Sequence, residues 1–189
     1  MEYATGLLIF IVLAMTSMNY YVKNKDVVLV ESKIDGRKYR VDKNSDPQGS
    51  ADLLAEINTD ILKLLDHLKS EDDPNVKRLC KRYNPDRLGE NLEYKSYKAY
   101  SLNKGEEIVL CLHDKDGKLI QDKNTMKFVL IHELAHVMTV ENGHPPIFWE
   151  NMGYLLKKAN SIGIYDAIDY SKNPVNYCDV LVDKTPYPF

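Results

Sequence analysis

The chain has 189 residues, of which 44% are hydrophobic and 28% are charged, and its formal net charge at pH 7 is −3. This length suits one folded domain with a hydrophobic core of its own. Lysine and arginine are spread along the chain and form no basic stripe, so the composition gives no support to a nucleic-acid-binding function.

An uncharged apolar stretch occupies the amino terminus, from Tyr3 to Val22. A helix of about twenty residues spans about 30 Å, which is the thickness of the hydrocarbon core of a bilayer. A cleaved secretory signal is the alternative, but Glu2 replaces the usual positive charge and no small-x-small cleavage site follows. The sequence therefore predicts an uncleaved transmembrane anchor over residues 1–23 and one domain over residues 24–189.

Flanking charges and cysteine usage both predict that this domain lies on the cytosolic side. Lys23 and Lys25 follow the apolar stretch at once, and the positive-inside rule places the positive flank in the cytosol. Cys80, Cys111 and Cys178 are widely spaced and form no C-x-x-C pair, which indicates reduced thiols rather than a disulfide framework. None of the three is a candidate metal ligand.

A hairpin and two helices are predicted in the first half of the domain. Residues 27–41 are rich in β-formers and contain Asp35-Gly36, a hairpin turn signal. Apolar residues recur at helical spacing over residues 53–68, and a shorter helix is predicted over residues 73–83. His67, on the longer helix, is expected at the surface.

Two strands are predicted ahead of the next helix. Tyr94, Tyr97 and Tyr100 lead into the first strand, and Asn103-Lys104-Gly105 makes a turn. Residues 107–113 form the second strand. His113 lies near the end of that strand and is expected at the surface.

Two further helices are predicted over residues 124–140 and 147–160. Asn142-Gly143 and the following proline pair stop the first of them. The tail over residues 165–189 has little helix or strand pattern and is expected to wrap around the domain. Together, these elements predict an α+β fold with a small antiparallel sheet.

The helix over residues 124–140 carries an H-E-x-x-H arrangement at His132, Glu133 and His136. Residues four positions apart share a helix face, so both imidazoles can reach one metal ion, and the carboxylate lies beside them. Such a carboxylate can handle the proton of a water that zinc activates. The arrangement therefore indicates hydrolysis.

A catalytic zinc ion takes a third protein ligand, and three residues are candidates. His144 is favoured, because Gly143 lets the chain turn after the helix and bring the ring back toward the metal. Glu141 is a rival, although its position on the helix directs it away from His136. Glu150, on the next helix, is a weaker rival.

The stretch His132-Glu133-Leu134-Ala135-His136, followed by His144-Pro145-Pro146-Ile147-Phe148-Trp149, resembles the WLM group of zinc metallopeptidases, which are relatives of the Wss1 and SprT proteases. The resemblance is closest to the small membrane-anchored WLM-like proteins of large DNA viruses. It extends to residues 32–39, 103–112 and 171–178. Seven residues separate His136 from His144, which is more than the better-known members usually have.

The resemblance implies a zincin-like fold in which His132, His136 and His144 bind Zn²⁺ and Glu133 is the general base of peptide-bond hydrolysis. It also makes the strand over residues 107–113 the candidate for pairing with an extended protein or peptide substrate, with an ordinary core strand as the alternative. The whole chain is then a membrane-anchored zinc metallopeptidase. Two alternatives stay open, namely a protease that acts on DNA-bound proteins and a non-catalytic membrane protein with a structural zinc site.

Overall fold

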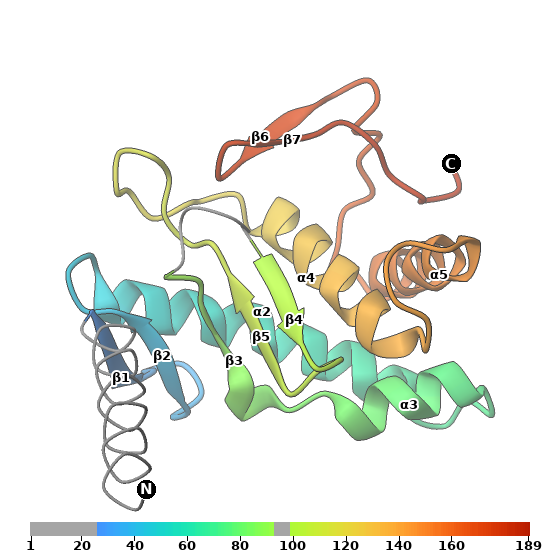
Figure 1. The fold of residues 1–189 in the computed structure, drawn as a ribbon, viewed down its shortest axis with the longest axis horizontal. Coiled ribbons are helices and arrows are strands. Elements are labelled where there is room, and N and C mark those ends of the chain that lie inside the picture. The colour runs from blue at the N-terminus through green and yellow to red at the C-terminus, as the bar shows by residue number, and fades with distance from the viewer. Residues whose placement is uncertain (1–25, 93–98) are drawn as a thin grey trace, which may run out of the picture.

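The computed structural model describes residues 26–92 and 99–189, which form a sheet with helices packed around it (Figure 1). The strands of this sheet are β1 (Val27–Glu31), β2 (Lys38–Asp42), β3 (Leu88–Glu90), β4 (Ala99–Leu102) and β5 (Glu107–Leu110). The helices are α2 (Pro47–Leu68), α3 (Pro74–Arg82), the 3₁₀ turn η1 (Pro85–Arg87), α4 (Lys123–Met138) and α5 (Pro146–Ser161). A separate hairpin of β6 (Val175–Tyr177) and β7 (Val180–Val182) lies in the C-terminal tail, for which the sequence predicted no strands.

The five-stranded sheet is mixed, with the strand order β1-β2-β3-β5-β4. The pairs β1–β2 and β4–β5 are antiparallel, because a short turn joins the two strands of each pair. In contrast, β3 pairs in parallel with both β2 and β5, and the connection from β2 to β3 runs through α2 and α3. The predicted antiparallel sheet is therefore wrong, because the sequence pattern reveals only the two local hairpins.

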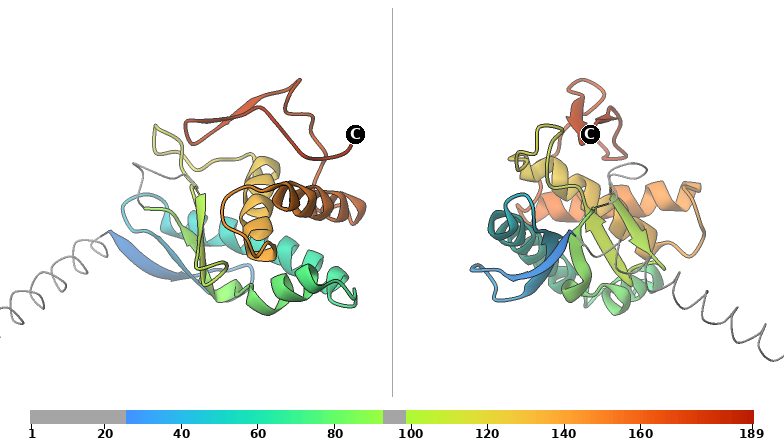
Figure 2. Two further views of the ribbon diagram at one scale, coloured as in Figure 1. Left: turned by 45° about the vertical axis from the view of Figure 1, so that its right-hand side comes forward. Right: turned by 60° about the vertical axis from the view of Figure 1, so that its left-hand side comes forward.

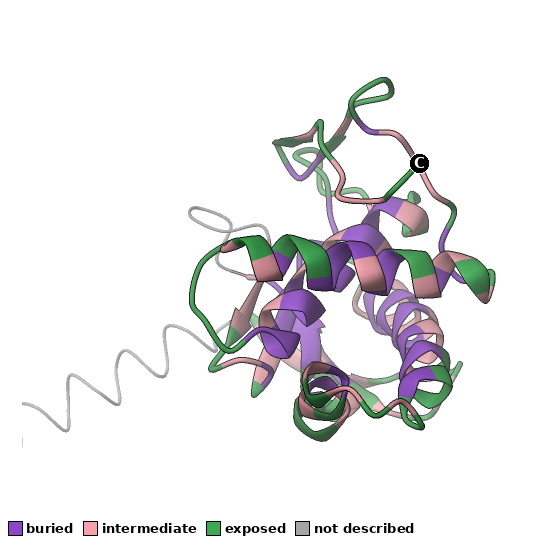
Figure 3. Ribbon diagram, turned by 90° about the vertical axis from the view of Figure 1, so that its right-hand side faces the viewer, coloured by how far each residue is buried: buried purple, intermediate pink, exposed green. Residues whose placement is uncertain are grey.

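The helix α2 packs against β1, β2 and β3 through the face that the apolar spacing predicted. The Asp46 side chain caps its start by accepting the Gly49 N–H at 3.0 Å, and Pro47 occupies the first turn. His67 is exposed, as expected. The buried apolar residues of this face are Leu53, Leu54, Ile57, Ile61, Leu64, Leu65 and Leu68. Figure 3 shows the buried sides of the helices turned toward the interior.

The helix α4 is enclosed by other elements, since it contacts α2, α3, α5, β4 and β5. Asp122 caps its start by accepting the Thr125 N–H at 3.0 Å. At its other end, Arg78 of α3 donates from Nε to the Val137 carbonyl at 3.0 Å. Ten of its sixteen residues are buried, so its position is set by packing on nearly every side.

The described part of the chain contradicts the membrane placement predicted from the sequence. Among the helices of residues 26–92 and 99–189, none is both long and apolar enough to cross a bilayer. The segment predicted as an anchor, residues 1–23, lies outside the described residues, as do Tyr94 and Tyr97 of the predicted strand. The single-pass localisation and the transmembrane part of the predicted fold are corrected accordingly.

A disulfide between Cys111 and Cys178 corrects the prediction of three reduced thiols. The two residues are 67 positions apart in the sequence, and the C-terminal tail folds back to bring them together at the end of β5. Their spacing gave no sign of this pairing, because the contact depends on the tertiary fold. Cys80 is a half-buried free cysteine. The argument for a cytosolic location from cysteine usage therefore no longer holds.

His113 is buried, which contradicts its predicted surface position. Its Nδ1 lies 2.7 Å from Oε1 of Glu90, whose other oxygen accepts the Asp42 N–H at 2.8 Å. The hydrogen bond with Glu90 raises the pKa of His113 above its ordinary value, against the opposing effect of burial. The carboxylates of Asp42 and Asp46 raise this pKa further. Parallel pairing of β3 with β5 creates this contact, and the sequence pattern does not show that pairing.

The buried pair predicts that part of the stability depends on pH. Because the pKa of His113 is raised above 6.5, the stabilisation is complete below that value and is lost as pH rises through the pKa of the folded protein. We expect His113→Gln to lower the free energy of unfolding by about 3 kcal/mol near pH 6 and by less near pH 9. Urea unfolding across this range measures the difference, and an equal loss at every pH would contradict a charged pair.

The disulfide predicts a large contribution to stability. We expect Cys111→Ala/Cys178→Ala to lower the free energy of unfolding by about 4 kcal/mol, because the bond closes a long loop in the unfolded chain. Urea unfolding of the oxidised protein and the double variant measures this change. Cys80→Ala is the matched control, since it removes a thiol without opening a disulfide. A loss in the double variant no larger than in the control would contradict the prediction.

Candidate metal centre

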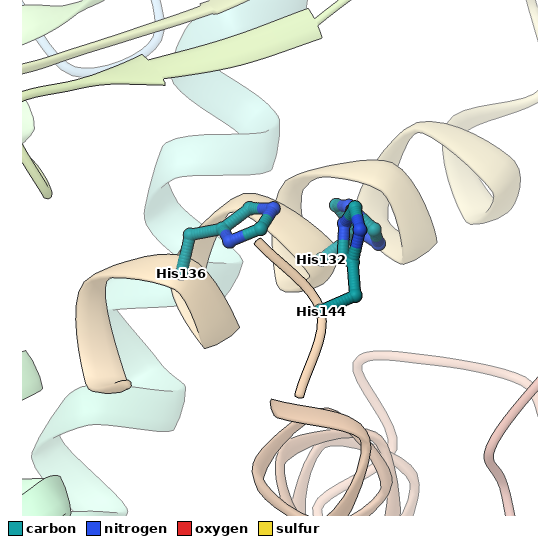
Figure 4. A group of neighbouring side chains, drawn as sticks. All are labelled: His132, His136 and His144. Carbon is teal, nitrogen blue, oxygen red and sulfur yellow. The ribbon is translucent and has the colours of Figure 1, made fainter. Parts of the chain in front are cut away.

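Three histidine side chains meet between α4 and the loop that follows it (Figure 4). His132 and His136 extend from successive turns of α4, and His144 reaches back from the loop before α5. The Nε2 atoms of His132 and His144 lie 3.1 Å apart, and one ring nitrogen from each histidine lies within 4.8 Å of the others. The structure thus brings His144 to the position that the sequence predicted.

This cluster fits a tetrahedral zinc ion. Zinc–nitrogen bonds of about 2.0–2.1 Å place two ligand nitrogens about 3.3 Å apart, close to the separation between His132 and His144. Burial, reinforced by the neighbouring histidines, lowers the pKa of His132 to about 3. Burial, His144 and Lys104 lower the pKa of His136 to about 4. These two imidazoles are therefore neutral at pH 7, as metal ligation requires.

The rival ligands lie apart from the cluster. Among the described residues, the only group of three or more potential ligand side chains consists of His132, His136 and His144, so neither Glu141 nor Glu150 joins it. Glu141 follows the end of α4 and is exposed, and Glu150 lies on an exposed part of α5. The choice of His144 as third ligand stays a prediction, now supported by its place beside the other two rings.

The ring of Phe148 packs against the rings of all three histidines. This ring is fully buried, and its centroid lies 4.9 Å from that of His132, 4.4 Å from His136 and 4.6 Å from His144. Trp149 stacks on His144 with centroids 5.5 Å apart, but 43% of its surface is exposed. The two neighbouring residues therefore have different roles, one in the core and one at the rim of the cluster.

Several contacts fix the loop that carries His144. Lys104 donates from Nζ to the carbonyl oxygens of Thr139 and Glu141, and a cation suits the carbonyl end of a helix. The buried Asn151 of α5 donates from Nδ2 to Oγ1 of Thr139 at 2.9 Å. Residues of the β4–β5 turn and of α5 thus hold the start of this loop from both sides.

Glu133 lies beside the histidines with only 6% of its surface exposed. Burial raises the pKa of its carboxyl group to about 7, although a hydrogen bond from the Ser101 backbone amide opposes this rise. Its neighbour on the helix, His132, belongs to the cluster. A carboxyl group with this pKa can accept and return a proton near neutral pH.

A cleft of about 470 Å³ opens on the cluster and on Glu133. One side is formed by Ala99, Tyr100 and Ser101 of β4, and the other by Asn142 and Gly143 of the loop. In the part of the sheet that the structure describes, β4 is the last strand and pairs with β5. The cleft therefore runs between β4 and the three histidines.

The strand that faces this cleft differs from the one predicted. Residues 107–113 were the candidate for pairing with substrate, with an ordinary core strand as the alternative, and β5 has β3 on one side and β4 on the other. Both of its edges are therefore occupied, which agrees with the alternative, and β4 is the last strand of the described sheet. The sequence located both strands of the hairpin but did not reveal which of them ends the sheet, because that depends on the parallel β3–β5 pairing.

Comparison with known proteins finds relatives among viruses. The chain is 29% identical over 185 residues to "Uncharacterized protein R325" of Acanthamoeba polyphaga mimivirus, an alignment that covers 93% of this chain and 94% of that protein. It is 40% identical over 84 residues to "Uncharacterized protein 042R" of Invertebrate iridescent virus 3 and 37% identical over 83 residues to "Uncharacterized protein 136R" of Invertebrate iridescent virus 6. These alignments cover 43% of this chain and about half of each iridescent virus protein. No family model and no solved structure matches.

The histidine cluster predicts metal binding by three side chains. We expect the unaltered chain to bind one zinc ion and His144→Ala to bind it more than about a hundredfold more weakly. Loss of a residue that only hydrogen-bonds to a metal ligand weakens binding by up to about a hundredfold, and loss of the ligand itself should cost more. Glu141→Ala is the matched control from the same loop and should bind as the unaltered chain does. Competition with a chromogenic chelator measures both affinities. Equal affinity in His144→Ala and the control would remove His144 from the site.

Proposed function

We propose that this chain is a zinc-dependent peptidase similar to the WLM group. The observation that carries the proposal is the buried carboxylate of Glu133, which lies beside three converging histidines at the wall of an open cleft. A zinc site that only stabilises a fold usually has four protein ligands and needs no adjacent base. The described cluster has three histidines and an adjacent base, which favours catalysis over a purely structural role.

The substrate class follows from the lining of the cleft. The cleft lies between β4 on one side and the loop of Asn142 and Gly143 on the other, so an extended peptide bound along β4 would pass over the histidines and Glu133. The proposed substrate is therefore an extended segment of protein or peptide.

The proposed reaction is the addition of water across a peptide bond, which yields a carboxylic acid and an amine. Zinc supplies a positive charge that activates water and polarises the scissile carbonyl group. His132, His136 and His144 would hold the ion through their ring nitrogens. Glu133 takes a proton from the attacking water and delivers it to the leaving nitrogen, so the carboxylate is regenerated at the end of each cycle.

The proposal predicts that Glu133 is needed for turnover but not for zinc binding. We expect Glu133→Gln to keep one zinc ion per chain and to lower kcat by about 10² to 10⁴, because the amide cannot take up the proton. Glu141→Gln is the matched control, since it makes the same change on an exposed residue of the neighbouring loop. Mass spectrometry of an unbiased peptide library measures cleavage. If the zinc-loaded chain cleaves no peptide, or cleaves equally well as Glu133→Gln, the proposal fails.

A further inference from the structure

The β6–β7 hairpin presents an apolar face toward α4. Its strands pair Val175 with Val182 and Tyr177 with Val180, and alternate residues of a strand point to the same side. These four side chains therefore share one face of the hairpin. Leu181, on the opposite face, is 56% exposed, while on the apolar face Tyr177 is buried and Val180 is 47% exposed at its edge. In Figure 1 and in both views of Figure 2 the red hairpin lies on the α4 side of the domain, away from α3.

A disulfide and a hydrogen bond hold the hairpin at the end of β5, and both are made to Cys111. Cys178 is joined to Cys111 by the disulfide, and the Tyr177 hydroxyl donates to the Cys111 carbonyl oxygen at 2.6 Å. Tyr177 is almost completely buried. A hairpin of two strands is marginally stable alone, so these two bonds set its position relative to α4.

The anchored hairpin closes an apolar pocket of about 240 Å³ beside Glu133, which we call the hairpin pocket. Phe128 and Val129 of α4 form one wall, and Tyr177, Val180 and Val182 of the hairpin form the opposite wall. The pocket shares Glu133 and His132 with the cleft, so it opens directly next to the reacting groups. The hairpin pocket therefore adjoins the cleft at the candidate active site.

We propose that the hairpin pocket selects an apolar side chain of the substrate next to the scissile bond, an inference that rests on the proposed peptidase function. Its volume lies below the roughly 300 Å³ at which sites for drug-sized ligands begin, so it suits one side chain. Most of its walls are aliphatic and aromatic, and His132 and Glu133 form the side that it shares with the cleft. A charged side chain would lose its hydration there, whereas each methylene group buried in the pocket strengthens binding about fourfold.

Binding of zinc-directed inhibitors tests this selection without any measurement of turnover. A series of peptide hydroxamates that differ in one side chain, namely methyl, isobutyl, benzyl or carboxymethyl, is titrated by calorimetry into the zinc-loaded full chain. We expect isobutyl to bind about tenfold to fiftyfold more tightly than methyl, because three further carbon atoms are buried. The carboxymethyl compound should bind no more tightly than the methyl compound.

Two variants assign the effect to the hairpin. Val182→Phe fills the pocket and should abolish the preference for isobutyl, while Leu181→Phe makes the same addition on the opposite face and should keep it. Val182→Ala widens the pocket and should shift the preference from isobutyl toward benzyl. Thermal unfolding of each variant confirms that it is folded before titration.

The outcomes separate the pocket from the metal site. Loss of the isobutyl preference in Val182→Phe alone supports the inference. The inference is overturned if the unaltered chain binds all the hydroxamates equally well. It is also overturned if Val182→Phe and Leu181→Phe lose the isobutyl preference to the same extent. Neither result bears on the metal site. If neither zinc nor acetohydroxamate binds the unaltered chain, the proposed function fails and the inference fails with it.

Discussion

Burial of α4 is the constraint on which the rest of the structure depends. The helix lies between α2, α3, α5 and the β4–β5 pair, so its apolar residues form much of the core. The same helix carries His132, Glu133 and His136, and the close packing around it therefore fixes their positions. Residues that hold the fold and residues that hold the candidate metal alternate along α4. Few changes to this helix can affect the site without also affecting stability.

Local patterns in the sequence located most helices and the two antiparallel hairpins. The apolar spacing over residues 53–68 and the turn at Asn103-Lys104-Gly105 depend on neighbours a few positions apart, and the structure has both features. The parallel pairs of β3, the disulfide of Cys111 and the burial of His113 depend on residues 20 or more positions apart. Because these contacts join residues that are distant in the sequence, local patterns could not predict them.

The candidate site shows the same division between local and distant contacts. His132, Glu133 and His136 could be predicted because helix geometry alone brings them together. His144 required a turn, which Gly143 supplies with a φ of 76°. The place of β4 along the cleft and the hairpin pocket were missed, since both depend on how distant strands are arranged in space. Buried Phe148, which touches all three histidine rings, had a sequence signal in its position four residues after His144.

Lys104 has a mechanical consequence for the cleft. It lies in the β4–β5 turn, yet it binds the carbonyl groups that begin the loop of His144, and Arg82 of α3 holds the same turn through the carbonyl oxygens of Asn103 and Lys104. The strand on one side of the cleft and the loop on the other are therefore coupled. Widening the cleft therefore requires breaking the contacts of Lys104 and Arg82. Under the proposed function, this coupling favours an unfolded segment or a chain end over a folded surface loop as substrate.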